Sequence, residues 1–167
     1  MGGTFRRAST QLACAMLLVL SAAAWADDAE IDALIDKSRV AMNEGKAKAA
    51  VAALTAAIEK APNRSDLYTL RARAQDANND FKAAIADASK AIELAPNEAY
   101  PYIERAKIYV AMEKMDQALT DANKAIEVAP NDPDGYYVRS DIYADMGKED
   151  EAKKDEKRAE EAEKAAH

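Results

Sequence analysis

The sequence predicts an all-α solenoid in which pairs of short helices stack in a row along the chain. Alanine accounts for 40 of the 167 residues and strand-forming residues are scarce, so thin, closely packed helices are favoured over sheets. An Ala-Pro-Asn tripeptide also recurs every 34 residues, with its prolines at Pro62, Pro96 and Pro130. A fixed period of this length is the sequence signature of a repeat architecture.

The segment 1–26 predicts a cleavable secretory signal. Arg6 and Arg7 precede an apolar stretch from Leu12 to Ala24, which is too short for a membrane anchor. Small residues two positions apart, Ala24 and Ala26, then stand directly before an acidic start. This ending is typical of bacterial signals. We expect export to the periplasm, with secretion as the alternative.

Two other export signals fit this segment less well. A lipoprotein signal places leucine three residues before the lipidated cysteine, but Gln11 stands there before Cys14. A twin-arginine signal has an apolar pair after its arginines, which the Ala-Ser-Thr after Arg7 does not supply. We therefore expect a mature chain that begins at Asp27 and has no membrane span.

This predicted mature chain is acidic and poor in reactive side chains. It has 21 Lys and Arg against 30 Asp and Glu, a net charge of −9, and its only histidine is His167. Because it has no cysteine, the composition excludes a thiol nucleophile, a disulfide and a Cys/His zinc site. The negative charge disfavours nucleic-acid binding. We predict no enzymatic activity, no cofactor and no metal.

Four repeat units follow from the 34-residue spacing. After a lead-in at 27–30, the units are 31–64, 65–98, 99–132 and 133–167. Each unit predicts two helices, which in the second unit run from Ser65 to Asn78 and from Phe81 to Ala95. Asn and Asp residues between the two helices form a turn, and the proline after the second helix stops it.

The units share further columns of aromatic and small residues. These are Tyr68, Tyr102 and Tyr136 near the start, Ala72, Ala106 and Ser140 four positions on, and Ala50, Ala84, Ala118 and Ala152 in the second helix. Together with the period, they resemble the tetratricopeptide repeat family over residues 31–166. The resemblance implies a right-handed solenoid and a non-enzymatic scaffold that binds a protein or peptide. The first unit departs from the pattern, with Leu34, Ser38 and Ala41 where the aromatic-rich helix would be.

The fourth unit ends in a segment that we interpret as the cap of the solenoid. From Glu149 to Ala166 it consists almost entirely of Glu, Lys and Ala. A terminal repeat needs such a polar outer face, because no further unit covers it. A frayed tail beyond Ala159 is the alternative.

Two columns of charged residues predict an ion pair inside three of the units. The columns are Arg71, Arg105 and Arg139 in the first helices, and Asp87, Asp121 and Asp155 in the second helices. The first unit lacks both members together, with Lys37 and Ala53 in their places. This joint presence and absence predicts a structural pair that joins the two helices of a unit.

The candidate binding site is the concave face, which the first helices of such a stack would line. One column on this face holds Arg39, Arg73 and Lys107, a basic stripe in an acidic protein. Apolar contacts beside the stripe are expected from Tyr100, Ile103 and Tyr137. We predict that a peptide with acidic residues binds in this groove. In the alternative, the face is solvated and its cations are neutralised locally, for instance Arg73 by Asp76.

Three other functions fit the sequence less well. Some members of the family hold a peptide's terminal carboxylate with Lys, Asn and Arg, but only Arg39 is suitable among the matching residues Ile35, Arg39, Leu70, Tyr100 and Glu104. An accessory or catalytic subunit acting on cell-wall material is the alternative function. It would need two converging carboxylates, whereas the acids here are spread along helix surfaces. Self-association through the ends of the stack is a third possibility.

Overall fold

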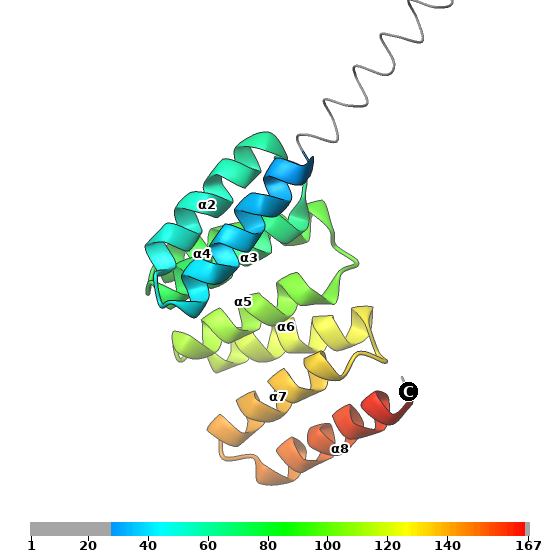
Figure 1. Cartoon of the computed structure of the whole chain (residues 1–167). Helices are drawn as coiled ribbons and strands as arrows, with labels where there is room; N and C mark the ends of the chain where they lie inside the picture. The colour runs from blue at the N-terminus through cyan, green and yellow to red at the C-terminus, as the bar shows by residue number, and fades with distance from the viewer. Residues whose placement is uncertain (1–27, 166–167) are drawn as a thin grey trace, which may run out of the picture.

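The computed structural model describes residues 28–165, and all regular elements in this range are α-helices (Figure 1). A first helix covers residues 28–43 and is followed by α2 (Ala47–Lys60), α3 (Ser65–Ala77), α4 (Phe81–Leu94), α5 (Ala99–Ala111), α6 (Met115–Val128), α7 (Pro133–Asp145) and α8 (Glu149–Ala165). The predicted all-α solenoid is confirmed. The predicted secretory signal, residues 1–26, lies outside the described residues.

The helices form four pairs that stack side by side (Figure 1). Within each pair the two helices run antiparallel and pack along their length, and each pair contacts the next. The first helix, α3, α5 and α7 form an inner layer, in which α3 contacts α5 and α5 contacts α7. We call α2, α4, α6 and α8 the outer layer. The candidate groove residues predicted from the sequence all lie on the inner layer.

Alanine columns fill the space between neighbouring helices. Ala84, Ala118 and Ala125 are at most 1% exposed, as are their counterparts in the other units, apart from Ala152 at 4%. Larger side chains such as Leu54, Leu67, Ile108 and Ile142 are completely buried between them. Because alanine adds only one methyl group beyond the backbone, the helix axes can approach closely. The core is therefore a series of small clusters rather than one centre.

The turn inside each pair has the same backbone conformation. One residue per turn has a positive φ, namely Gly45 (71°), Asn79 (60°), Glu113 (60°) and Gly147 (73°). In the second pair, the amide of Asn79 donates to the Asp76 carbonyl at 2.8 Å, and the amide of Asp80 to the Gln75 carbonyl at 2.9 Å. Such bonds close the end of a helix with a left-handed residue. The second helix of each pair therefore starts in the same direction.

The aromatic column fixes the boundaries between pairs. The hydroxyl of Tyr68 donates to the Pro62 carbonyl at 3.0 Å, that of Tyr102 to Pro96 at 3.2 Å, and that of Tyr136 to Pro130 at 3.1 Å. Each bond ties the linker before an inner helix back onto that helix. The repeated proline thus ends one pair, and its carbonyl anchors the next.

The last helix closes the stack. Its buried residues are Ala152, Asp155 and Ala159, while the other positions of α8 are mostly polar and exposed. This is the pattern expected of a polar cap. The helix continues to Ala165, past the point where the alternative placed a frayed tail.

Candidate functional site

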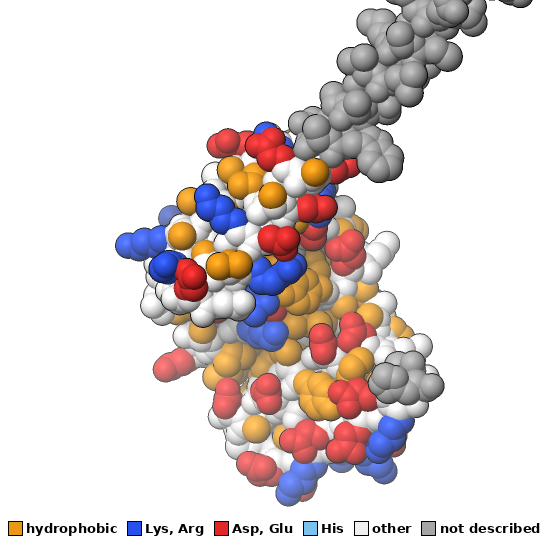
Figure 2. All heavy atoms as spheres, in the orientation of Figure 1, with side chains coloured by type: hydrophobic (Ala, Val, Ile, Leu, Met, Phe, Trp, Pro, Cys, Tyr) orange, Lys and Arg blue, Asp and Glu red, His pale blue; other side chains and the backbone are white. Residues whose placement is uncertain are grey.

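The inner layer forms one hollowed face of the molecule. Figure 2 shows Lys and Arg side chains near the middle of this face, beside a hydrophobic patch. Asp and Glu side chains are prominent over the half that contains α5 to α8. The groove is therefore not uniformly charged, although the protein as a whole is acidic.

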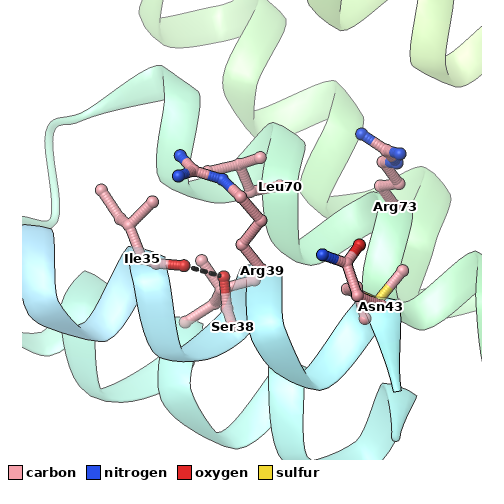
Figure 3. A pocket seen from close by; sticks show the side chains of 8 residues that line it. Ile35, Ser38, Arg39, Asn43, Leu70 and Arg73 are labelled. Carbon is pink, nitrogen blue, oxygen red and sulfur yellow. Dashed lines mark hydrogen bonds between the residues drawn. The ribbon is translucent and has the colours of Figure 1, made fainter. Parts of the chain in front are cut away.

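A small cavity opens into the groove between the first helix and α3 (Figure 3). Its volume is about 100 Å³, and its lining residues are Ile35, Ser38, Arg39, Met42, Asn43, Leu54, Leu70 and Arg73. Apolar side chains form much of the wall, and the two arginines come from neighbouring inner helices. The structure thus brings together two of the three cations that the sequence predicted for the basic stripe.

The two arginines at this cavity differ in their partners. Nη1 of Arg39 donates to Oδ1 of Asp36 at 2.9 Å, and both side chains are more than 60% exposed. Arg73 forms no hydrogen bond or ion pair with any residue in the range 28–165. In particular, the alternative pairing of Arg73 with Asp76 does not occur. Arg73 is therefore a cation that has no ion-pair partner within residues 28–165, and it lines a largely apolar cavity.

Lys107, the third member of the stripe, lies on α5. Its Nζ donates to Oε1 of Glu104 at 2.9 Å, and its side chain is 52% exposed. Glu104 itself is only 5% exposed. The stripe thus continues onto α5, but there its charge is balanced by a buried carboxylate.

The predicted apolar contacts are only partly available to a ligand. Tyr100 is 39% exposed. Tyr137 is half-buried, and desolvation together with the nearby carboxylate of Glu163 raises the pKa of its hydroxyl. The prediction is corrected for Ile103, which is 2% exposed and packs in the core cluster with Ala106 and Val138. Its position faces the neighbouring helices instead of the groove.

Two carboxylates between α3 and α5 were missed by the sequence reasoning as a pair. Asp76 lies on α3, and its Oδ1 is buried without a hydrogen-bond partner among the described residues. Desolvation, and to a lesser extent the nearby charge of Glu104, raises the pKa of Asp76. The signal in the sequence is their repeat position, since Asp76 and Glu104 stand where Met42 and Leu70 stand one unit earlier.

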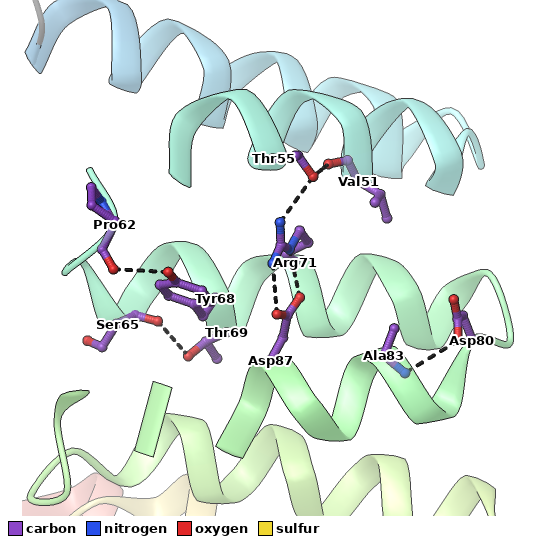
Figure 4. A network of polar contacts seen from close by, with 10 residues as sticks. All are labelled: Val51, Thr55, Pro62, Ser65, Tyr68, Thr69, Arg71, Asp80, Ala83 and Asp87. Carbon is purple, nitrogen blue, oxygen red and sulfur yellow. Dashed lines mark hydrogen bonds and ion pairs between the residues drawn. The ribbon is translucent and has the colours of Figure 1, made fainter. Parts of the chain in front are cut away.

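The arginine column has a structural role outside the groove. Nε and Nη2 of Arg71 donate to the two carboxylate oxygens of Asp87 at 2.7 and 2.8 Å (Figure 4). Nη1 donates to Oγ1 of Thr55, on the preceding pair, at 3.1 Å. One guanidinium therefore joins three helices from two pairs. This fork-shaped geometry is the strong form of the arginine–carboxylate contact.

The same bridge recurs in the next two pairs. Arg105 binds Asp121 and Ser89, and Arg139 binds Asp155 and Asn123. The hydrogen bond to the aspartate raises the pKa of each guanidinium. The predicted Arg–Asp pairs are confirmed, and the link to the preceding pair is an addition. These arginines are engaged in the fold and are not candidates for ligand binding.

The described residues also bear on membrane and metal sites. Between residues 28 and 165, no helix combines the length and apolar character needed to cross a membrane. The same range contains no group of three or more Asp, Glu, His or Cys side chains arranged to hold a metal ion.

Comparison with known proteins places the chain among repeat proteins. The family model of ChAPs (Chs5p-Arf1p-binding proteins) matches residues 5–126, and the Tetratricopeptide repeat model matches residues 133–165. No sequence among the curated proteins matches the chain.

Solved structures show the same fold. A crystal structure of MamA aligns with a TM-score of 0.67 and 24% identity, over 81% of this chain and 80% of that chain. The first tetratricopeptide domain of Spaghetti (RPAP3), bound to the HSP90 peptide SRMEEVD, aligns with a TM-score of 0.64 and 23% identity, over 71% of this chain and 96% of that one. An O-GlcNAc transferase mutant of Thermobaculum terrenum aligns with a TM-score of 0.63 and 21% identity, over 70% of this chain but 22% of the enzyme. By its two model matches, the chain belongs to the ChAPs and tetratricopeptide repeat families, and its fold is that of a protein–protein interaction scaffold.

Proposed function

We propose that this protein is a non-enzymatic interaction scaffold of the bacterial cell envelope, and that its groove binds a peptide segment containing acidic residues. The location rests on the signal pattern of residues 1–26. The binding mode rests on the inner layer, where cations and apolar side chains lie together.

The observation that carries the proposal is that Arg73, which has no ion pair in the described part of the chain, lies beside Arg39 at the cavity. A guanidinium presents several donors in a planar fork that suits a carboxylate. The only ion pair of Arg39 among the described residues is an exposed i,i+3 contact with Asp36, which a ligand can displace at little cost. The apolar wall between the two arginines gives an aliphatic side chain of the ligand a place to lose contact with water.

A structural relative supports this binding mode by analogy. The RPAP3 domain is bound to the peptide SRMEEVD, which contains three acidic residues. The present chain has the same fold and places two arginines on its inner layer. We therefore favour the groove over the outer layer as the binding surface.

The test is a crosslinking pull-down from the periplasm with the mature protein as bait. Reversing the stripe with Arg39→Glu, Arg73→Glu and Lys107→Glu is expected to abolish capture of the partners that the wild type retains. The matched control is Lys90→Glu on α4, whose side chain is 46% exposed and belongs to the outer layer. Unchanged capture by the triple variant would direct the search to the outer layer.

The envelope location is tested separately. Expression of the full chain in a Gram-negative host should yield a periplasmic protein whose first residue is Asp27, as read by N-terminal sequencing. A cytoplasmic protein that retains Met1 would contradict this part of the proposal without affecting the groove.

A further inference from the structure

The cavity between the first helix and α3 is apolar away from its two arginines. Leu54 is 1% exposed, and Ile35, Met42 and Leu70 are partly buried and line the same cavity. The hydroxyl of Ser38, which also lines it, donates to the Ile35 carbonyl at 2.6 Å (Figure 3). A water molecule held among such side chains has few polar partners. An apolar group that displaces it therefore gains binding energy.

This apolar lining is not repeated at the next step of the groove. Thirty-four residues further on, the positions of Ile35, Met42, Leu54 and Leu70 hold Thr69, Asp76, Ala88 and Glu104. One more unit along, they hold Ile103, Val110, Ala122 and Val138, which all belong to one core cluster or pack against it. Apolar side chains at the third step are thus used in the core, whereas those at the first step border a cavity.

The volume of the cavity limits what can enter it. It measures about 100 Å³, whereas an apolar protein cavity of about 150 Å³ holds a benzene ring. The space therefore suits the branched aliphatic side chain of a leucine or isoleucine and is too small for an aromatic ring. Met42 from the first helix and Leu70 from α3 both line the cavity, so their size sets this limit.

The charges beside the cavity determine what surrounds the aliphatic side chain. Arg39 and Arg73 line the same cavity from two different helices (Figure 3). Arg39 pairs with the exposed Asp36, and Arg73 has no ion pair within residues 28–165. A segment whose aliphatic side chain enters the cavity brings its neighbouring residues to these two guanidinium groups. Guanidinium groups bind carboxylates in a planar, forked geometry.

We infer that the partner segment inserts one leucine or isoleucine side chain into this cavity, beside Asp or Glu residues that bind Arg39 and Arg73. We call the inserted side chain the anchor. Met42 and Leu70 are then specificity residues, because they exclude an aromatic anchor. The inference rests on the proposed function and specifies its ligand by the size of the anchor.

Selection from a display library of short random peptides tests this motif. The peptides are flanked by Gly-Ser spacers at both ends, so that side chains supply every carboxylate. The target is immobilised protein purified after expression of the full chain. Enriched peptides should share a leucine or isoleucine with Asp or Glu beside it. Phenylalanine, tyrosine and tryptophan should be depleted at the position of the anchor.

Fluorescence polarisation with a selected peptide then measures the preference for the anchor. Wild-type protein should bind this peptide at least about tenfold more tightly than a version with alanine as the anchor, because alanine leaves most of the cavity unfilled. A version with phenylalanine should also bind about tenfold more weakly, because the ring does not fit without moving the walls. This comparison needs no protein variant.

Enlarging the cavity should reverse the second preference. Met42→Ala removes the side chain beyond Cβ, so this variant should bind the phenylalanine version at least as tightly as the original peptide. The matched control is Met112→Ala, directly after α5. Met112 is also partly buried, but it packs against a different core cluster and does not line the cavity. Met112→Ala should keep the wild-type preference.

The outcomes separate the inference from the proposed function. Enriched acidic peptides without a common aliphatic residue, or equal binding of the leucine and phenylalanine versions to wild type, would overturn the inference and leave the proposed function standing. A preference that Met42→Ala does not change would also overturn the inference. Identical enrichment by wild type and by Arg39→Glu/Arg73→Glu/Lys107→Glu, or no enrichment at all, would overturn both.

Discussion

At the scale of single residues, the strongest polar contacts of this molecule serve the fold. The side chains of Arg105 and Asp121 are 21% and 5% exposed, and they form two charge-assisted hydrogen bonds of 2.7 and 2.8 Å. Removing one member of such a pair leaves the other charge desolvated without its partner. The groove cations, in contrast, are exposed and weakly held.

The Arg105–Asp121 pair predicts a large loss of stability for Asp121→Ala. We expect its free energy of unfolding to fall by about 3 kcal/mol, because Arg105 loses its counter-charge. The control is Glu127→Ala on the same helix, whose pair with Lys124 is exposed and is expected to contribute less than about 0.5 kcal/mol. Urea denaturation measures both values. Equal losses would show that the bridge is no stronger than a surface pair.

Asp76 predicts a pH-dependent gain of stability on substitution. Its pKa is raised in the folded state, so the folded protein binds the proton more tightly than the unfolded chain does. The charged form therefore destabilises the fold above the folded-state pKa, and this cost disappears as the pH falls below the ordinary aspartate value. Asp76→Asn should be more stable than wild type at pH 7, by less than about 1 kcal/mol because the side chain is partly exposed.

Thermal unfolding from pH 7 down to pH 3 checks this sign. The difference between Asp76→Asn and wild type should shrink as the pH falls. A variant that is less stable than wild type at pH 7 would mean that the carboxylate has an attractive partner.

The sequence predicted which residues recur at equivalent repeat positions better than it predicted where their side chains point. The Arg–Asp pairs followed from identical residue types recurring together, but the third partners Thr55, Ser89 and Asn123 differ in type and share only a side-chain oxygen. Ile103 was misplaced because its column lies at the edge of the groove face, where Thr69 is also 1% exposed. A rotation of a helix by less than one residue decides whether such a side chain meets solvent or a neighbouring helix.

At the scale of elements, the sequence predicted helix ends to within one residue. The predicted second helix of the second unit ended at Ala95, whereas α4 ends at Leu94. Ala95 precedes Pro96, whose ring disfavours the helical conformation at the residue before it, and Ala95 has φ −140° and ψ 72°. Proline therefore removes one more residue from the helix than its position alone suggests.

The left-handed turn predicts a stabilising substitution. Glu113 has a φ of 60°, although the equivalent residues of the first and last pairs are Gly45 and Gly147. The left-handed conformation costs a residue with a Cβ about 1–2 kcal/mol of conformational free energy, whereas glycine adopts it without this cost. Glu113→Gly should therefore raise the free energy of unfolding by about 1 kcal/mol.

The control for this prediction is Glu113→Ala. It removes the same charge but keeps the Cβ, so its stability should remain within about 0.5 kcal/mol of the wild type. A gain in both variants would assign the effect to the charge of Glu113 rather than to the backbone.

At the scale of the whole molecule, the main contacts among α2 to α8 join helices of the same pair or of neighbouring pairs, so stability is approximately a sum of local terms. The largest core cluster joins α5, α6 and α7, and the clusters near the first helix are smaller. Amide hydrogen exchange should be slowest in α5 and α6 and fastest in the first helix and the C-terminal half of α8. Uniform protection across all pairs would instead indicate one cooperative unit.

The architecture could be predicted from the sequence because the same helix and turn pattern recurs in several units. A pattern that is weak evidence in one unit becomes strong evidence when it recurs at a fixed spacing. The side-chain contacts within the groove could not be predicted in the same way, since they depend on which side chains of different units meet. Asp76 and Glu104 are 28 positions apart, and only the packing of α3 against α5 makes them neighbours. Such contacts arise where the sequence deviates from the repeat, and a repeat pattern alone does not predict them.

The arginine bridges, each of which joins three helices, also affect how repeat units can be added to such a chain during evolution. Each arginine needs an aspartate in its own pair and a side chain with an oxygen in the pair before it, and the units 65–98 and 99–132 each supply both an aspartate and such an oxygen. A duplicate of segment 65–98 inserted after Glu98 would present Ser89 to the arginine of the copy, while the serine of the copy would meet Arg105. Gene duplication can thus lengthen the array without breaking a junction, and each added copy is free to diverge along the inner layer.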